Sequence, residues 1–72
     1  MKILLGIYMM MSNGKTYIDV EDGNYIEILL TDDQKRIVPV NTKIAITVHA
    51  LPDSGGRYLV PSDLGRFFTE MA

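Results

Sequence analysis

The side chains that could do chemistry are few and stand far apart in this sequence. The chain has no cysteine, and His49 is its single histidine, so a thiolate nucleophile and a Cys/His metal site are both excluded. Asp32 and Asp33 form a carboxylate pair, but no second half of a metal site follows at a recognisable spacing. We therefore expect a solvated turn at Asp32–Asp33 and a surface or interface histidine, and we predict no enzyme activity, no catalytic residue, no metal and no cofactor.

Three short stretches resemble known motifs but fail on spacing or context. Asp19–Asn24 is acidic like a calcium loop, yet its glycine comes one position early and an extended segment replaces the exiting helix. Ser12–Lys15 ends like a phosphate-binding loop but lacks the upstream glycine and the hydroxyl residue after the lysine. Leu51–Gly55 reads LPDSG, which is similar to a sortase signal, but no apolar span and basic tail follow it. We interpret the three stretches as turns or loops.

Composition predicts a single small domain, residues 1–72, with more apolar residues than it can bury. A domain of this size hides only about 60% of the surface that its unfolded chain exposes. Hydrophobic residues make up 47% of the chain, and no disulfide can stabilise it. Small domains without such links often gain stability by associating, so we expect a homo-oligomer or an obligate protein partner. The formal charge of −2, with basic residues spread along the chain, does not favour nucleic acid as the partner.

The apolar run Ile3–Met11 is best explained as a strand. It is too short to span a membrane, and Ser12-Asn13-Gly14 provides no signal-peptidase site, so we expect a cytoplasmic protein. Asn13-Gly14 is the preferred pair of a type I′ hairpin turn, and an extended segment, Lys15–Val20, follows at once. Both faces of the first strand are apolar, which is typical of a strand buried on both sides. Either a second subunit covers the outer face, or the strand crosses the core of a barrel.

Further strands follow, separated by turn residues. We expect them at Tyr25–Leu30, Arg36–Val40, Lys43–Leu51 and Arg57–Val60, with polar turns at Glu21–Asn24 and Thr31–Gln34. Pro39 cannot donate to a sheet, so the strand containing it should lie at an edge or carry a bulge.

The end of the chain has the periodicity of a helix. Ser62 is a good N-cap, and apolar residues then recur at helical spacing, at Leu64, Phe67, Phe68 and Met71. The sequence as a whole thus predicts a mainly β fold: a small five- to six-stranded antiparallel meander or barrel, SH3-like or Sm-like, with a short C-terminal α-helix at about residues 62–71.

One stretch of the sequence resembles the Sm-like Hfq RNA chaperones. IYMMMSNGKTYIDVEDGNYIEILL, followed by TKIAITV, is similar to the family's IYLxNG strand, its bent strand ending in ILL and its KxAI strand, over Ile7–Val48. The chain lacks the family's N-terminal helix and the glycine that bends the second strand, and Ile44 replaces the histidine of the family's Lys-His pair. The resemblance implies a ring oligomer that binds RNA.

We expect a non-enzymatic module for protein–protein interaction, such as an adaptor, an inhibitor or an assembly component, that associates with itself and with another protein. An Sm/Hfq-like RNA-binding ring is the alternative. Tyr17 and Tyr25 are predicted to pair across a hairpin. The expected contact elements are the first strand and the C-terminal helix, and the candidate partner-binding residues are Ile7, Met9, Met10, Met11, Tyr17, Tyr25, Phe67 and Phe68.

Overall fold

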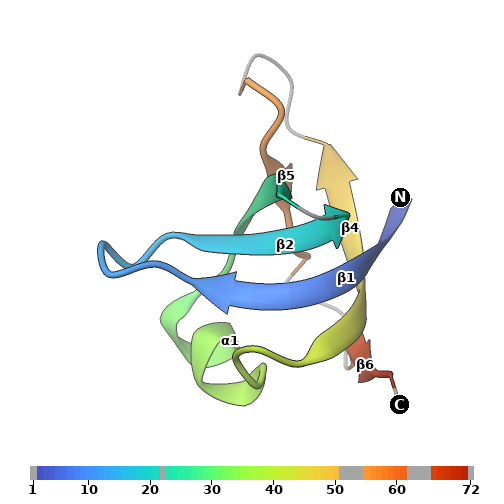
Figure 1. Ribbon diagram of the computed structural model, residues 1–72. Coiled ribbons are helices and arrows are strands. Elements are labelled where there is room, and N and C mark those ends of the chain that lie inside the picture. The colour runs from blue at the N-terminus through green and yellow to red at the C-terminus, as the bar shows by residue number, and fades with distance from the viewer. Residues whose placement is uncertain (1, 22, 51–54, 62–65, 72) are drawn as a thin grey trace.

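A computed structural model describes residues 2–21, 23–50, 55–61 and 66–71 (Figure 1). Within these ranges the chain forms short strands and one short helix, in the order β1 (Lys2–Met10), β2 (Thr16–Glu21), β3 (Asn24–Leu29), α1 (Asp32–Ile37), β4 (Lys43–Ala50), β5 (Tyr58–Leu59) and β6 (Phe68–Glu70). The mainly β architecture is confirmed, as are the strands expected around β1, β2, β3 and β4.

Five of these strands close into a barrel, and β6 extends it. The hydrogen-bonded order is β1-β2-β3-β5-β4-β6, and an additional pairing of β1 with β4 closes the ring. The antiparallel meander is corrected here, because β5 is inserted between β3 and β4 and runs parallel to β3. This strand order, with a helix between β3 and β4, is the connectivity of the OB-fold, a five-stranded Greek-key barrel.

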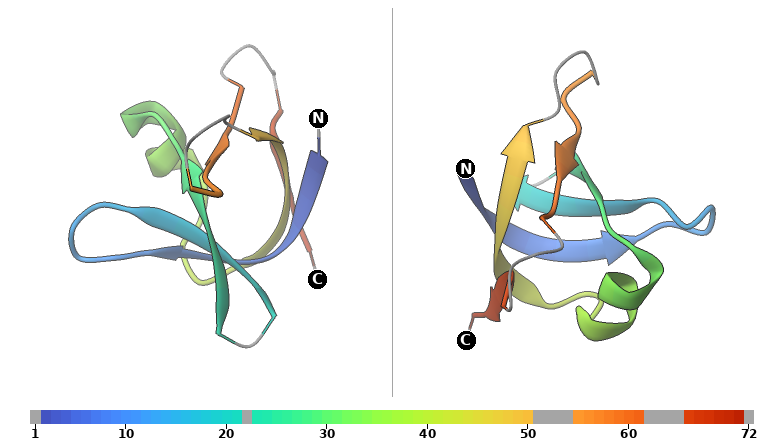
Figure 2. Two further views of the ribbon diagram at one scale, coloured as in Figure 1. Left: turned by 90° about the horizontal axis from the view of Figure 1, so that it is seen from above. Right: turned by 180° about the vertical axis from the view of Figure 1, so that it is seen from behind.

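β1 belongs to both halves of the barrel because it changes neighbours at its middle. Its first half pairs with β4 over Lys2–Ile7, and its second half pairs with β2 over Ile7–Met10. Gly6 lies where the change occurs, and a Cβ built there would be 2.3 Å from the carbonyl oxygen of Asp19 on β2. Only glycine lets the two backbones approach so closely. Figure 2 shows the N-terminal part of β1 running away from the β2–β3 hairpin.

The hairpin between β1 and β2 forms as expected but with a different turn. The Gly14 amide donates to the Met11 carbonyl oxygen at 3.0 Å, and Gly14 has a φ of +86°. Asn13 is not among the residues with positive φ, so the type I′ turn is corrected to a type I turn followed by a left-handed glycine. The Asn13 side chain stabilises the turn by accepting a hydrogen bond from the Lys15 amide at 3.0 Å.

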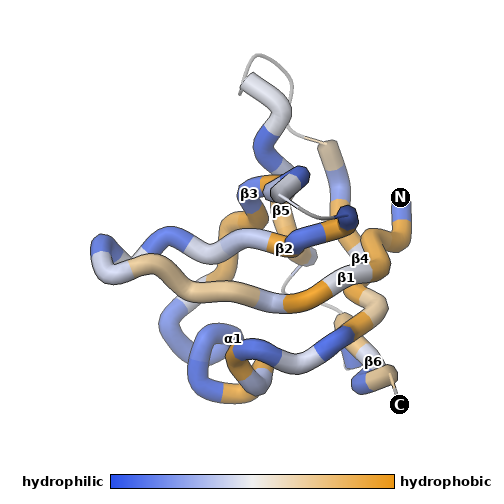
Figure 3. Tube along the Cα trace, in the orientation of Figure 1, coloured by the Kyte–Doolittle hydropathy of each residue, from blue (hydrophilic) through white to orange (hydrophobic). Residues whose placement is uncertain are grey.

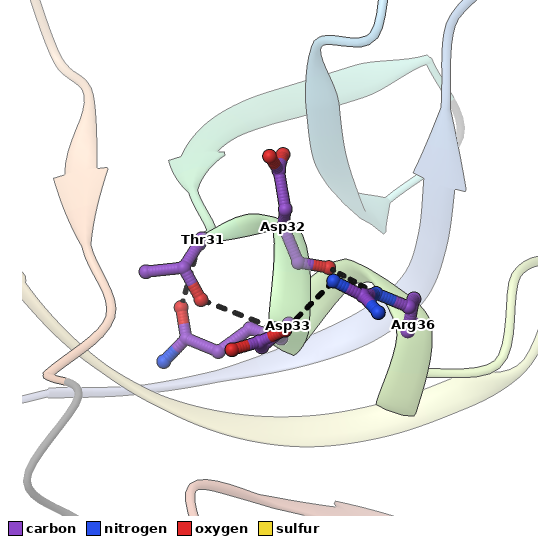
Figure 4. A network of polar contacts seen from close by, with 5 residues as sticks. Thr31, Asp32, Asp33 and Arg36 are labelled. Atoms are coloured by element: carbon purple, nitrogen blue, oxygen red, sulfur yellow. Dashed lines mark hydrogen bonds and ion pairs between the residues drawn. The ribbon is translucent and has the colours of Figure 1, made fainter.

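The strand expected at Arg36–Val40 is wrong, because Arg36 and Ile37 form the end of helix α1 and residues 38–40 form no strand (Figure 4). Thr31 and Gln34 form a capping box: the Gln34 amide donates to Thr31 Oγ1 at 3.1 Å, and the Thr31 amide donates to Gln34 Oε1 at 2.9 Å. Asp32 and Asp33 lie in the first turn, where the helix dipole favours negative charge. The helix ends at Ile37, and Val38 is its C-cap. Val38 precedes Pro39, which disfavours helical backbone at that position.

The C-terminal helix is also corrected over the described residues. Phe68–Glu70 is the strand β6, which pairs with β4 in the register Ile46↔Phe68 and Ile44↔Glu70. The predicted N-cap and Leu64 lie outside the described residues. Phe67 is buried in the core, and its ring centroid is 5.2 Å from that of Phe68. Burial against the sheet, rather than a helical face, explains the two phenylalanines.

The core fills the barrel and contains mostly β-branched residues, as expected for strands packed in a closed sheet. Its buried hydrophobic members among the described residues are Leu4, Tyr8, Ile18, Ile28, Val38, Ile44, Ile46, Val48, Val60 and Phe67. Within the described residues, no helix is long and apolar enough to cross a membrane.

Candidate protein-interaction surface

The outward face of β1 carries a row of exposed apolar side chains. Because side chains alternate along a strand, burial of Leu4, Gly6 and Tyr8 turns the intervening residues outward. Ile3 is 68% exposed, Leu5 47% and Ile7 43%, while Met9 is half-buried. We call these four residues, Ile3, Leu5, Ile7 and Met9, the β1 row. Figure 3 shows the apolar character of this strand.

The neighbouring strands extend the β1 row with small and uncharged residues on one side. Leu5 lies opposite Ala45 of β4, which in turn lies opposite Thr69 of β6. Ile3 lies opposite Thr47. Directly opposed residues of an antiparallel pair share a face of the sheet, so this side of the surface has small side chains and is nearly uncharged. Lys43, opposite Ile7, is the one charged residue of this β1–β4 register on the outer face.

Aromatic and acidic residues border the β1 row on the other side. Met9 lies opposite Tyr17, and Ile7 lies opposite Asp19, which itself faces Tyr25 of β3. The rings of Tyr17 and Tyr25 meet edge to face with centroids 6.4 Å apart. The tyrosine pair expected from the sequence is therefore present.

Asp19 also has an unsatisfied oxygen. Its Oδ1 is buried and has no hydrogen-bond partner in the described part of the molecule. The carboxylate lies beside a surface hollow of about 270 Å³ at the point where β1 and β2 separate. Leu5, Gly6, Ile7, Asp19, Val20, Glu21 and Lys43 line this hollow.

The residues predicted to bind a partner fall into three groups. Ile7, Met9, Tyr17 and Tyr25 lie together on the outward face of β1, β2 and β3. Met10 and Met11 are exposed near the hairpin turn, away from the middle of that face. Phe67 and Phe68 belong to the β6 region, where Phe67 is buried in the core and Phe68 packs against it.

Ile3 and Leu5, the two most exposed members of the β1 row, were not singled out from the sequence. The apolar alternation covers the whole run, so the pattern alone cannot distinguish the outward set from the buried set. Gly6 alone was not a sufficient signal. Its close approach to the Asp19 backbone, which marks the inward face and so places Leu5 and Ile7 on the outward one, is known only from the structure.

Among the described residues, no group of three or more His, Asp or Glu residues could hold a metal ion. His49 is exposed near the end of β4. The Asp33 carboxylate is 2.8 Å from Arg36, and both side chains are well exposed, so this ion pair belongs to the surface of α1.

Burial raises the pKa of the Tyr8 hydroxyl above its usual value of 10.0. The hydroxyl is enclosed in the core and has no hydrogen-bond partner among the described residues. It therefore has no access to a substrate.

Comparisons of the chain with protein-family models, with curated proteins and with solved structures found no match. The resemblance to the Hfq proteins thus rests on the sequence stretch alone. The insertion of β5 between β3 and β4 also departs from the sequential strand order of the Sm-like meander that we expected.

Proposed function

We propose that the protein is a non-enzymatic module for protein–protein interaction and that its contact surface is the β1 row. The observation that carries the proposal is the exposure of Ile3, Leu5 and Ile7 side by side on one strand face. Scattered apolar residues are normal on a surface, but a continuous row next to small, uncharged neighbours is typical of an interaction site.

The charges around the β1 row favour protein over nucleic acid. Asp19 and Glu27 lie on the β2–β3 side of the surface. On the outer face, Lys43 is the only cation among the residues that pair in the registers of β1 with β2 and with β4. A nucleic-acid site needs several cations to replace the counterions of the phosphates.

Site-specific photocrosslinking tests the proposal in the cells that make the protein. A photoreactive amino acid replaces Leu5 in the β1 row, and the control protein carries it at Arg36, which is exposed on α1. We expect discrete crosslinked species from position 5 and none from position 36. If position 5 gives no adduct, or only the same adducts as position 36, the β1 row is not a contact surface.

Binding of single-stranded nucleic acid is the second candidate function. Tyr17 and Tyr25 lie on the β2–β3 face, which is the face that binds oligonucleotides in proteins with the OB-fold connectivity. Aromatic rings on such a face can stack on bases. Measurement of RNA and single-stranded DNA affinity at several salt concentrations separates the candidates. Tight binding with a steep salt dependence, lost in Tyr17→Ala, would replace the first proposal.

A further inference from the structure

The strand that carries the β1 row also has an unpaired backbone edge. The Tyr8 amide donates to the Thr42 carbonyl oxygen at 3.0 Å, so the even-numbered residues of β1 direct their backbone groups toward β4. The Met11 amide donates to the Lys15 carbonyl oxygen at 2.9 Å, so the odd-numbered residues direct theirs toward β2. Pairing with β2 begins only at Ile7. The amide and carbonyl groups of Ile3 and Leu5 therefore point to an edge that no described strand occupies.

We propose that this edge pairs with the same edge of a second copy of the chain, as antiparallel β1 strands related by a two-fold axis at Leu4. This inference rests on the proposed function, because it names the partner of the same surface. In this register Ile3 of each copy exchanges both backbone hydrogen bonds with Leu5 of the other. An isologous antiparallel pair of this kind requires two residues, two positions apart, whose backbone amide and carbonyl groups point to the free edge.

The side chains of this edge suit a second copy. Ile3 and Leu5 are 68% and 47% exposed. The register places Ile3 of each copy opposite Leu5 of the other copy. Four aliphatic side chains would then form one apolar cluster across the two-fold axis. Cross-strand apolar pairs of this kind stabilise antiparallel sheets.

The charges on this edge permit the same register. Lys2 of the second copy would lie opposite Gly6, so no two charged residues face each other across the axis. The Lys2 side chain contacts Tyr58 of its own chain: its Nζ donates to the Tyr58 hydroxyl at 3.3 Å and lies 5.4 Å from the ring centroid. Like Leu4, Lys2 has the strand parity opposite to that of Ile3 and Leu5, so its charge does not interrupt the apolar cluster.

The free edge of β6 is a poorer site for self-association. The Thr47 amide donates to the Phe67 carbonyl oxygen and the Met71 amide to that of Lys43, so Phe68 and Glu70 point away from β4. Arg66 Nε already donates to the Phe68 carbonyl oxygen at 3.4 Å. Pairing this edge with its own copy about Thr69 would place each Glu70 carboxylate opposite Phe68 of the other copy, so a charge would face an aromatic ring in place of the apolar pairs of the β1 edge. The β6 edge therefore serves as an internal control.

Amide hydrogen exchange tests the pairing without any substitution. The full chain is compared at micromolar and at millimolar concentration, and its mass is measured under both conditions. We expect the Ile3 and Leu5 amides to become protected as dimer forms, while the Phe68 and Glu70 amides do not change. A monomer at both concentrations, or equal protection at the two edges, would overturn the proposal.

Proline substitution supplies the matched variants. Leu5→Pro removes an outward donor without removing a bond to β4, and Glu70→Pro does the same at the β6 edge. We expect Leu5→Pro to raise the dimer dissociation constant at least ~10-fold and Glu70→Pro to leave it unchanged. Should Leu5→Pro not fold, as judged by circular dichroism, Ile3→Pro removes the other outward donor near the end of the strand. Equal dimerisation by a folded proline variant at position 3 or 5 contradicts the pairing.

The outcomes also separate this inference from the proposed function. A chain that stays monomeric yet crosslinks from position 5 to another protein refutes the β1–β1 pairing and leaves the interaction surface standing. A chain that dimerises with no protection of Ile3 and Leu5 refutes the pairing as well. Absence of any crosslink from position 5 refutes both the β1–β1 pairing and the proposed interaction surface.

Discussion

Replacement of Gly6 by alanine should destabilise the protein strongly, because β2 crosses β1 at this glycine. The added Cβ would lie 2.3 Å from the Asp19 carbonyl oxygen and 2.8 Å from both the Asp19 carbonyl carbon and Ile18 Cγ2. Two of these three atoms are backbone, so the overlap cannot be relieved by rotating a side chain. The strands must move apart instead, and the closure of the barrel must absorb the movement.

The size of the effect follows from two opposing terms. Overpacking typically costs ~1–3 kcal/mol, and contact with rigid backbone places Gly6→Ala at the upper end. Alanine also lowers the conformational entropy of the unfolded chain, which stabilises the folded state by ~0.4–1 kcal/mol. We expect a net loss of about 2 kcal/mol, within a total stability of ~4–11 kcal/mol for a chain of this length. The corresponding decrease in melting temperature is ~8–16 °C.

Chemical denaturation monitored by circular dichroism measures this loss. Gly14→Asn is the matched control, because Gly14 has nothing within 4 Å of a built Cβ and a left-handed φ that asparagine tolerates. We expect the control to lose less than ~1 kcal/mol. If Gly6→Ala unfolds at the same denaturant concentration as the wild type, the close approach of β1 and β2 is wrong, and with it the assignment of outward residues on β1.

Substitutions at three further positions probe the core and the helix cap. Tyr8→Phe removes a buried hydroxyl that has no hydrogen-bond partner among the described residues, and it should leave stability at neutral pH unchanged or raise it by up to ~1 kcal/mol. Because burial raises the folded-state pKa of Tyr8 above 10.0, the stability that its protonated form contributes is present below pH 10 and decreases above it, so urea titrations at rising pH should show a smaller decrease for Tyr8→Phe than for the wild type. Thr31→Ala removes the capping-box hydroxyl and should cost ~1 kcal/mol in thermal melts, whereas Thr31→Ser should cost much less; equal losses would argue against the cap. Thr16→Val should cost ~1 kcal/mol, because the buried Thr16 hydroxyl donates to the Ile28 carbonyl oxygen at 2.7 Å; an unchanged midpoint would show that this bond adds nothing.

Several strands were predictable from local sequence because their signals are short-range. Alternating apolar residues and turn residues specify β1, β2, β3 and β4, and each strand agrees with its pattern to within a few residues. Helix α1 was predictable in principle, since Thr31 and Gln34 have the spacing of a capping box, but its six residues give too little periodicity to outweigh the turn interpretation. At Phe67 and Phe68 a helix-like spacing was misleading, because contacts with β4 stabilise an extended backbone there.

The candidate surface depended on information that the sequence does not contain. By itself the sequence determined that β1 is apolar on both faces and that the chemistry of the side chains is poor in nucleophiles and metal ligands. Only the tertiary structure decided which face of β1 is buried, because this depends on the pairing of β1 with both β4 and β2 and on the crossing at Gly6. Long-range pairing likewise inserted β5 beside β3 and left the Ile3–Leu5 edge unpaired. Local patterns specify elements, but the faces and edges available to a partner arise only when strands distant in sequence close the barrel.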